Sequence, residues 1–191
     1  MAKYTVNEVA DCILKFYNDY ITNLKLQKFL YYSQAWNLAL RGKPLFDEDF
    51  QAWVHGPVEP VTYQRFKRFG FKPIIYNVKV DFDKHLMGHV KNVFEAYGGF
   101  SGFGLERQTQ SEPPWMDVRG DLPSDQPSIV IITKKSMLDY YSSLLDRKMS
   151  PALKLRNLRR ACRRAHWTEG MIREACEGKV GEGKIGKGNR S

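Results

Sequence analysis

The chain has 191 residues, of which 42% are hydrophobic and 13% aromatic. A disordered chain would be poorer in both classes, so the composition predicts a folded core, and the length suits one domain of about 150 residues with an extension. The longest uncharged apolar stretch, Phe29 to Leu40, is too short to cross a bilayer, the first residues lack a signal-peptide pattern, and the three cysteines suggest no disulfide framework. We therefore expect a soluble, cytoplasmic protein without a membrane partner.

Positive charge is concentrated in the C-terminal part of the chain. The net charge is +9, but residues 1–146 hold 17 basic and 17 acidic residues, whereas residues 147–191 hold 13 basic and 4 acidic ones. We predict a neutral domain over 1–146, a basic amphipathic helical extension over 147–177 and a disordered, Gly/Lys-rich tail over 178–191. A basic segment of this kind suits nucleic acid or an acidic protein surface.

The first two helices are well signalled. Thr5 and Glu8 have the spacing of a capping box, and an apolar stripe follows at Val9, Ile13, Phe16 and Tyr20. A second helix is expected to begin at Thr22 and to stop at Gly42 and Pro44. Because this helix is apolar around much of its circumference, we predict that it lies at the centre of the domain.

The next segments alternate between extended chain and helix. Residues 45–54 are predicted to be extended, and His55-Gly56-Pro57 is predicted to form a turn. Pro60 suits the first position of a third helix that runs to Gly70. Residues 74–82 alternate apolar and polar side chains, which predicts a strand or an extended segment.

The rest of the domain is expected to be helix and loop. A stripe from Leu86 to Tyr97 predicts a fourth helix, followed by a flexible glycine-rich loop over 98–104 and a short helical turn around Leu105. Four prolines predict a loop over 111–127, residues 129–132 suit a short strand, and residues 137–144 suit a fifth helix. The fold class is therefore mainly α: a compact helical domain of about five helices with one or two short β-strands, plus a basic C-terminal helical extension.

Catalytic motifs are not evident in the sequence. There is no Gly-x-Ser-x-Gly elbow and no Walker loop, and Cys12 lies beside an apolar stripe, where a thiol is usually inert. His85 and His89, with Asp81, have a spacing that suits metal ligands, but solvated polar positions opposite the apolar stripe explain them better. A second such combination lies in the extension and consists of Cys162, His166 and Cys176. We predict no metal, no cofactor and no enzymatic activity.

The densest signal is the run from Trp53 to Val58, which joins a large aromatic, a titratable ring and a sharp turn. It suits either a corner that defines the fold or a preorganised contact surface, and both roles can coexist. Trp115, after two prolines, suits either a lid on the core or an exposed anchor, and the lid is favoured.

Several motifs in order resemble the Panacea family of SocA-like antitoxins. The run from Leu24 to Trp36 is similar to its signature Leu-x-Lys-Leu-Leu-Tyr-Tyr-x-Gln-x-Trp, and the run from Gly42 to Phe46 to Gly-x-Pro-Leu-Phe. Residues 52–58 are similar to Ala-Trp-x-x-Gly-Pro-Val. Pro114-Trp115 with Arg119 resembles Pro-Trp-x-x-x-Arg. The resemblance covers about residues 5–146, with one departure: Thr109-Gln110 stands where the family commonly has Thr-His.

The resemblance implies an antitoxin from a bacterial or phage two-gene system that neutralises a cognate toxin by direct protein binding, without a cofactor. Some relatives are thought to present the toxin to a protease, so a protease-adaptor role is possible in principle. The partner-binding residues expected here are Trp53, His55, Gly56, Pro57, Tyr63, Tyr31, Tyr32 and Trp115. The basic extension is expected to make contacts through Arg156, Arg159, Arg160, Arg163 and Arg164.

Three other functions remain open from the sequence. The arginine face suits phosphate contacts, which favours nucleic-acid binding such as autorepression of an operon. A metal-dependent enzyme would use His85 and His89. A phage or prophage protein would bind a host defence factor in place of a toxin.

Overall fold

The computed structural model describes residues 2–17 and 21–148, with side chains as far as Leu145. The chain divides into two units, Met1–Leu145 and Asp146–Ser191. The predicted extension, apart from Arg147 and Lys148, and the predicted tail lie outside the described residues, and so do the five arginines expected to make contacts.

The described residues form seven α-helices, one 3-10 helix and three short strands, which confirms the predicted mainly α fold. In chain order the elements are α1 (Val6–Tyr17), α2 (Asn23–Arg41), β1 (Phe50–Trp53), β2 (Gly56–Val58), α3 (Pro60–Phe66), η1 (Lys67–Phe69), α4 (Lys84–Tyr97), α5 (Gly102–Gln110), α6 (Pro113–Arg119), β3 (Ile131–Ile132) and α7 (Lys134–Lys148).

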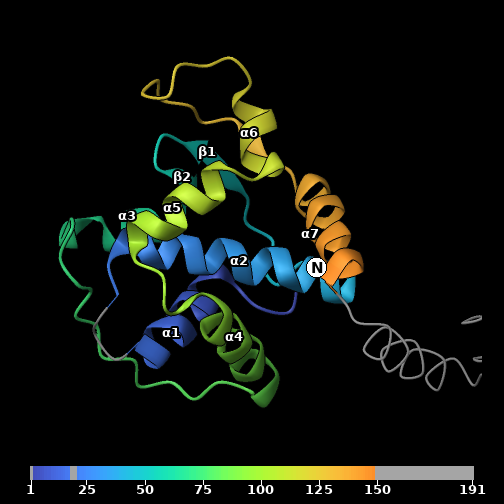
Figure 1. The fold of residues 1–191 in the computed structure, drawn as a ribbon. Coiled ribbons are helices and arrows are strands. Elements are labelled where there is room, and N and C mark those ends of the chain that lie inside the picture. Colours follow the sequence, from blue (N-terminus) through green and yellow to red (C-terminus); the bar gives the residue numbers. More distant parts are fainter. Residues whose placement is uncertain (1, 18–20, 149–191) are drawn as a thin grey trace, which may run out of the picture. The chain divides into compact units, whose positions relative to one another are not determined.

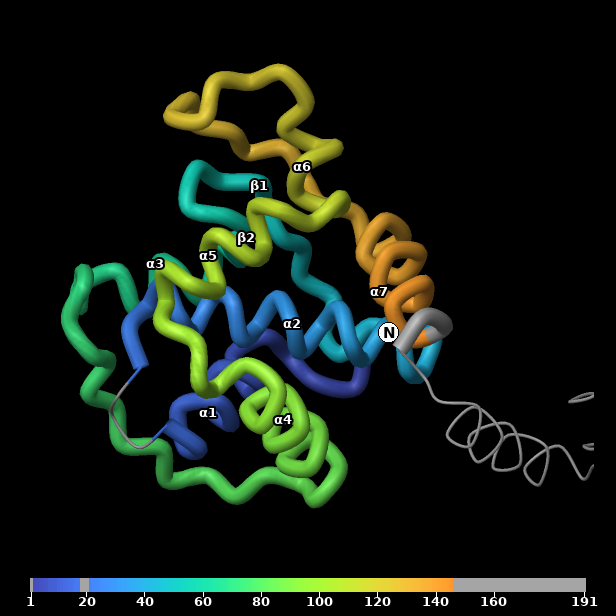
Figure 2. The backbone as a smooth tube through the Cα atoms, in the orientation of Figure 1, coloured from blue at the N-terminus to red at the C-terminus, as the bar shows by residue number. Residues whose placement is uncertain are grey.

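Helix α2 is central, as predicted. In Figures 1 and 2 it runs across the middle of the first unit, with α1 and α4 on one side and the β1–β2 hairpin and α5 on the other. Residues on every side of α2 are buried, including the polar Gln27, Lys28 and Gln34. These polar side chains must therefore form their hydrogen bonds inside the protein.

The predicted caps of the first two helices are confirmed. The Thr5 backbone N–H donates to Glu8 Oε2 at 2.7 Å, and the Glu8 N–H donates back to Thr5 Oγ1 at 3.2 Å. Thr22 accepts from the Lys25 N–H at 3.3 Å, and Gly42, with φ +66°, donates its N–H to Leu38 O at 2.7 Å. These four interactions fix where α1 and α2 begin and where α2 ends.

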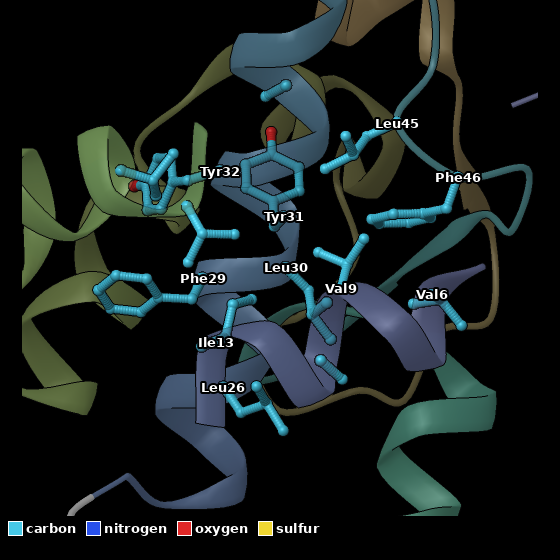
Figure 3. Close-up of a cluster of buried hydrophobic side chains, with 14 of the residues drawn as sticks. Val6, Val9, Ile13, Leu26, Phe29, Leu30, Tyr31, Tyr32, Leu45 and Phe46 are labelled. Carbon is cyan, nitrogen blue, oxygen red and sulfur yellow. The ribbon is translucent and has the colours of Figure 1, made fainter. Parts of the chain in front are cut away.

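One part of the core lies between α1 and α2, with the segment before β1 beside it (Figure 3), and the same cluster continues into α4, α5, β3 and α7. Figure 3 shows Val9 and Ile13 of α1 facing Leu26 and Leu30 of α2, all fully buried. Burial of each such side chain contributes about 1.5–3 kcal/mol, so this contact anchors the helical framework.

The strands form one antiparallel sheet in the order β2-β1-β3. Trp53 pairs with Gly56, so the hairpin turn consists of Val54 and His55. The predicted turn at His55-Gly56-Pro57 was therefore one residue out of register, because Gly56 and Pro57 belong to β2. Proline is tolerated there because β2 is an edge strand.

Residues 74–82 form no strand. Only the preceding Pro73 pairs, through an isolated bridge to Thr22. The segment is nevertheless extended in pattern, since Ile74 is buried and Ile75 is exposed. Its alternation reflects packing on the core without a partner strand. The strand expected over 129–132 forms as β3, and it is shorter than predicted.

The helical turn expected around Leu105 forms as the longer helix α5, and α6 lies where a loop was expected, which raises the number of helices from about five to seven. Ser101 caps α5 by accepting from the Gly104 N–H at 3.0 Å, so the glycine-rich segment ends in a first helical turn. Pro113 and Pro114 occupy the first positions of α6, where no N–H donor is needed.

Candidate functional site

The tip of the β1–β2 hairpin is held through its main chain by side chains from α5 and α6. The Arg119 guanidinium donates to Ala52 O at 3.2 Å, and the Trp115 indole N–H donates to Trp53 O at 3.0 Å. Gln110 Nε2 donates to Val54 O at 2.8 Å. Three consecutive carbonyls of the strand and turn are thus fixed by side chains from outside the sheet.

Lys28 of α2 binds two further carbonyl groups of the hairpin from inside the protein. Its Nζ donates to His55 O and, at 3.0 Å, to Pro57 O. The side chain is fully buried, and desolvation lowers the pKa of its amine to about 7, opposed only in part by the Glu106 carboxylate. A neutral amine has two N–H donors, which matches the two carbonyls that accept from it.

Glycine is required at position 56 by the backbone conformation and by the lack of space for a side chain. Its φ is +87°, and a Cβ added there would lie 2.8 Å from Lys28 Nζ and 2.8 Å from Thr109 Oγ1. Both features exclude a side chain at this position. The close approach of the strand to Lys28 is what allows the carbonyls to reach the amine.

Above this support, aromatic and polar side chains point outward. The Trp53 ring meets the Tyr63 ring edge to face, with centroids 4.8 Å apart. His55 has a side chain that is 70% exposed, and its Nδ1 lies 2.9 Å from Glu106 Oε1. The carboxylate orients the imidazole and leaves Nε2 directed away from it.

These residues border a cleft of about 340 Å³. Its lining is mostly apolar and comes from α2, the hairpin, α3, η1 and α5: Asn23, Leu24, Gln27, Trp53, His55, Val58, Tyr63, Lys67, Gly70, Phe71, Phe103 and Glu106. Phe71 and Phe103 are 88% and 65% exposed. Exposed large aromatics around a concave surface are typical of a binding site.

The structure brings together three of the expected contact residues, Trp53, His55 and Tyr63. Gly56 and Pro57 lie beneath the tip and are buried. Trp115 is half-buried against the core, where it supports the hairpin.

The expectation that Tyr31 and Tyr32 contact a partner was wrong, because both side chains are fully buried. The Tyr31 ring packs on Phe50, and the Tyr32 hydroxyl donates to Glu112. Neither ring can contact a partner at the surface.

Sequence reasoning missed Phe71, Phe103 and Glu106. The first two each follow a glycine, but a preceding glycine does not mark a side chain as exposed.

A second buried polar cluster lies between α2, α6 and α7. Glu112 accepts from the Tyr141 hydroxyl at 2.6 Å and from the Tyr32 hydroxyl at 3.3 Å. Burial raises the pKa of the Glu112 carboxyl to about 7, although the tyrosine donors oppose the shift. This cluster is structural, since it joins three helices away from the cleft.

The histidines of α4 do not form a metal site. Within residues 2–17 and 21–148, no group of three His, Cys, Asp or Glu is placed to hold a metal ion. His89 is buried, with Nε2 2.8 Å from Ser33 O, so the expectation that it is solvated was wrong. His85 lies beside the Tyr4 hydroxyl, and Asp81 pairs with Lys15. The Cys162, His166 and Cys176 combination lies outside the described residues.

Two further expectations concern Cys12 and membrane spans. Cys12 is buried, and burial raises the pKa of its thiol to about 12, which agrees with an inert role. No helix in the part of the chain that the structure describes is long and apolar enough to cross a membrane.

The central helix, the hairpin it supports and α3 to α5 are the region that matches a known family. The family model for the SocA-like antitoxin, Panacea domain, matches residues 26–116, which confirms the expected resemblance. Antitoxin SocA of Caulobacter vibrioides (strain NA1000 / CB15N) is 47% identical over 55 residues. That alignment spans 29% of this chain and 29% of the relative's length. No solved structure matches the chain.

The geometry explains the signature residues of the family. Lys28 holds the hairpin, and Gln34 accepts from the Leu45 N–H at 2.7 Å while donating to Phe46 O at 2.8 Å. Gln110, which departs from the usual histidine, supplies an N–H donor to Val54 O. Its amide therefore meets a structural need of the hairpin.

Proposed function

We propose that this chain is an antitoxin that neutralises a cognate toxin by direct binding through the hairpin tip and the adjoining cleft. The observation that carries the proposal is the clamped hairpin, in which side chains of three helices hold five carbonyl groups. A rigid backbone loses little conformational entropy on association, so the aromatic area of Trp53 is preorganised for binding.

The side chains of the cleft favour binding over catalysis. No serine, threonine or cysteine is among the residues that line it, so a covalent nucleophile of those types is missing from the site. The His55–Glu106 pair is a suitable hydrogen-bonding contact for a partner. The antitoxin role of the matched family supports the same direction.

The test is co-expression with the product of the reading frame that adjoins this gene. That product alone is expected to arrest growth, and this chain is expected to restore growth and to co-purify with it. The double variant His55→Ala/Phe71→Ala removes exposed groups from the site and is expected to lose rescue without loss of thermal stability. Ile75→Ala is the control, since Ile75 is 74% exposed and does not line the cleft. Rescue by the double variant equal to that by the control would refute the proposed site.

The uneven charge of the chain favours a second contribution from the basic extension. Residues 147–191 hold 13 basic and 4 acidic residues, and the proposed role is to cover an acidic toxin surface or, as a second candidate function, to bind nucleic acid. Deletion of residues 149–191 is expected to weaken toxin binding in the first case. In the second case it abolishes a salt-dependent gel shift with DNA. If both measurements are unchanged, the extension has neither role. A protease-adaptor role predicts faster toxin degradation in cells that contain the complex.

A further inference from the structure

The segment from Lys67 to Lys72, which contributes Lys67, Gly70 and Phe71 to the lining of the cleft, carries cations that pair with no acidic side chain among the described residues. These cations, Lys67, Arg68 and Lys72, are exposed. Their neighbour Arg65 differs, because it pairs with Asp11 at 2.7 Å. Although residues 1–146 are neutral as a whole, this segment at the rim of the cleft is locally positive.

Large aromatic side chains are interleaved with these cations. Phe71 lies between Gly70 and Lys72 and is 88% exposed, and the Arg68 guanidinium lies 5.0 Å from the centroid of the Phe69 ring. Lys67 and Phe71 both line the cleft, together with the hairpin residues Trp53 and His55. An apolar hollow therefore lies directly beside a row of unpaired positive charges.

The chemistry of the hollow differs from that of its rim. The cleft, of about 340 Å³, has room for a large side chain, and its walls are mostly apolar. Glu106 is the one acidic residue among those that line it, and its Oε1 is engaged by His55. Phosphate groups inside the hollow would face this carboxylate, whereas an apolar side chain would not be repelled.

We infer that the cleft binds a segment of the partner protein in which an aromatic or large aliphatic residue is flanked by Asp or Glu. This inference rests on the proposed function and gives the partner's binding segment a chemistry. The apolar residue fills the hollow between Trp53 and Phe71, and the acidic residues meet Lys67, Arg68 and Lys72. Charge complementarity at such a rim acts mainly on the association rate and on specificity.

A nucleic acid is a poorer fit to the same surface. Single-stranded binding sites follow the phosphate backbone with a continuous basic groove and stack several bases in succession. Here the cations lie on one side of a single hollow, and Glu106 lies within it. The test below therefore treats an oligonucleotide as a competitor.

The first arm of the test uses synthetic peptides and the full chain. The probe is a short peptide with one Phe flanked on both sides by Glu, and the matched peptides replace Glu by Lys or Phe by Ser. We expect only the first peptide to shift the NMR signals of the Trp53 indole and the Phe71 amide, with binding that weakens as salt is raised. Equal shifts with the Lys peptide, no shift with any peptide, or tighter binding of oligodeoxythymidine would each overturn the inference.

The second arm uses charge reversal and the product of the adjoining reading frame. Lys67→Glu/Lys72→Glu is expected to slow association by about tenfold at low salt, and the difference is expected to shrink at high salt. Lys43→Glu/Lys79→Glu makes the same change in net charge at exposed lysines that do not line the cleft, and it is expected to leave the rate within about twofold.

The two arms separate the inference from the proposed function. If the wild-type chain does not bind the neighbouring product, the proposed function fails, and the peptide arm still decides the inference. If the wild-type chain binds the product and both double variants slow association equally, the proposed function stands and the charged rim plays no part.

Discussion

Gly56 and Lys28 constrain each other at the base of the hairpin. The glycine brings the backbone against the buried amine, and the amine satisfies two carbonyls that the turn exposes to the interior. Neither residue offers a contact to a partner. Both act by fixing the path of the chain that carries Trp53 and His55.

Substitution of Gly56 by alanine tests this constraint. We expect Gly56→Ala to destabilise the protein by about 1–3 kcal/mol from backbone strain, with an added cost because its Cβ would lie 2.8 Å from Lys28 Nζ. Gly42→Ala is the matched control, with φ +66° and no atom within 4 Å of the added Cβ. Urea denaturation of both variants is the measurement, and a Gly56→Ala cost no larger than that of Gly42→Ala would contradict the close approach.

Lys28 gives the stability of the protein a characteristic pH dependence. The pKa of its amine is about 7 in the folded protein, against 10.5 for a free lysine side chain. Between these values the unfolded chain binds more protons, so the free energy of unfolding gains about 1 kcal/mol per pH unit as pH rises. Lys28→Met lacks this titration, so its stability relative to wild type should fall as pH is raised from 7.5 towards 9.5. Parallel pH profiles for the two proteins would show that the amine is not desolvated.

Much of the site could be predicted from the sequence, but the position of the tyrosines could not. Trp53, His55 and Tyr63 meet at the cleft as their motif suggested. Tyr31 and Tyr32 were expected at the surface, yet α2 is buried on every side. Polar residues normally mark the solvent face of a helix, whereas here Lys28 and Gln34 bind backbone groups inside the protein. A helix of this kind has no polar face from which exposure can be inferred.

At the scale of the elements, Glu112 joins three helices. It lies just before α6 and binds hydroxyls of α2 and α7 through Tyr32 and Tyr141. Because burial raises the pKa of this carboxyl to about 7, we expect the stability of the contact with α7 to depend on pH.

Glu112→Gln tests that dependence. The pKa of the carboxyl is about 7 in the folded protein, against 4.5 for a free glutamate side chain. Its stabilising effect is therefore full below pH 4.5 and is lost as pH rises through 7. Wild type should therefore lose about 1 kcal/mol per pH unit relative to Glu112→Gln between pH 5 and 7. Thermal melts across this range are the measurement, and a constant difference in stability would argue against a buried, protonated carboxyl.

The sequence predicted only a helical turn around Leu105 where α5 forms, and it predicted a loop where α6 forms. Gly102 and Gly104 in α5, and Pro113 and Pro114 in α6, belong to residue types that usually mark loops. Their positions are in first turns, where glycine is tolerated and proline needs no donor. Residues 74–82 show the opposite case, since their alternation was correct but no neighbouring strand pairs with them. The local sequence pattern predicts an extended backbone, and tertiary packing decides whether that segment forms hydrogen bonds with a neighbouring strand.

At the scale of the whole molecule, the first unit contains the complete described core. The buried hydrophobic residues of the cluster run from Val6 to Tyr141. The positive charge, in contrast, belongs to residues 147–191. The described core and the excess of positive charge therefore belong to different parts of the chain.

A chain that ends at Lys148 should fold on its own. We expect its circular dichroism to remain helical and its melting temperature to stay within about 4 °C of the full chain, because no residue of the core cluster is removed. Its isoelectric point should fall towards neutrality. A broad, non-cooperative melt would show that the C-terminal residues contribute to the core.

The clamp on the hairpin also bears on how such a protein can change its target. At positions 54 and 55 the hairpin is held through backbone carbonyl oxygens, and every amino acid carries the same carbonyl group. Mutations that exchange the side chains of Val54 and His55 therefore alter the chemistry shown to a partner while the anchoring atoms stay in place. The side chains at the tip can therefore change during evolution while the backbone hydrogen bonds that hold the tip stay the same.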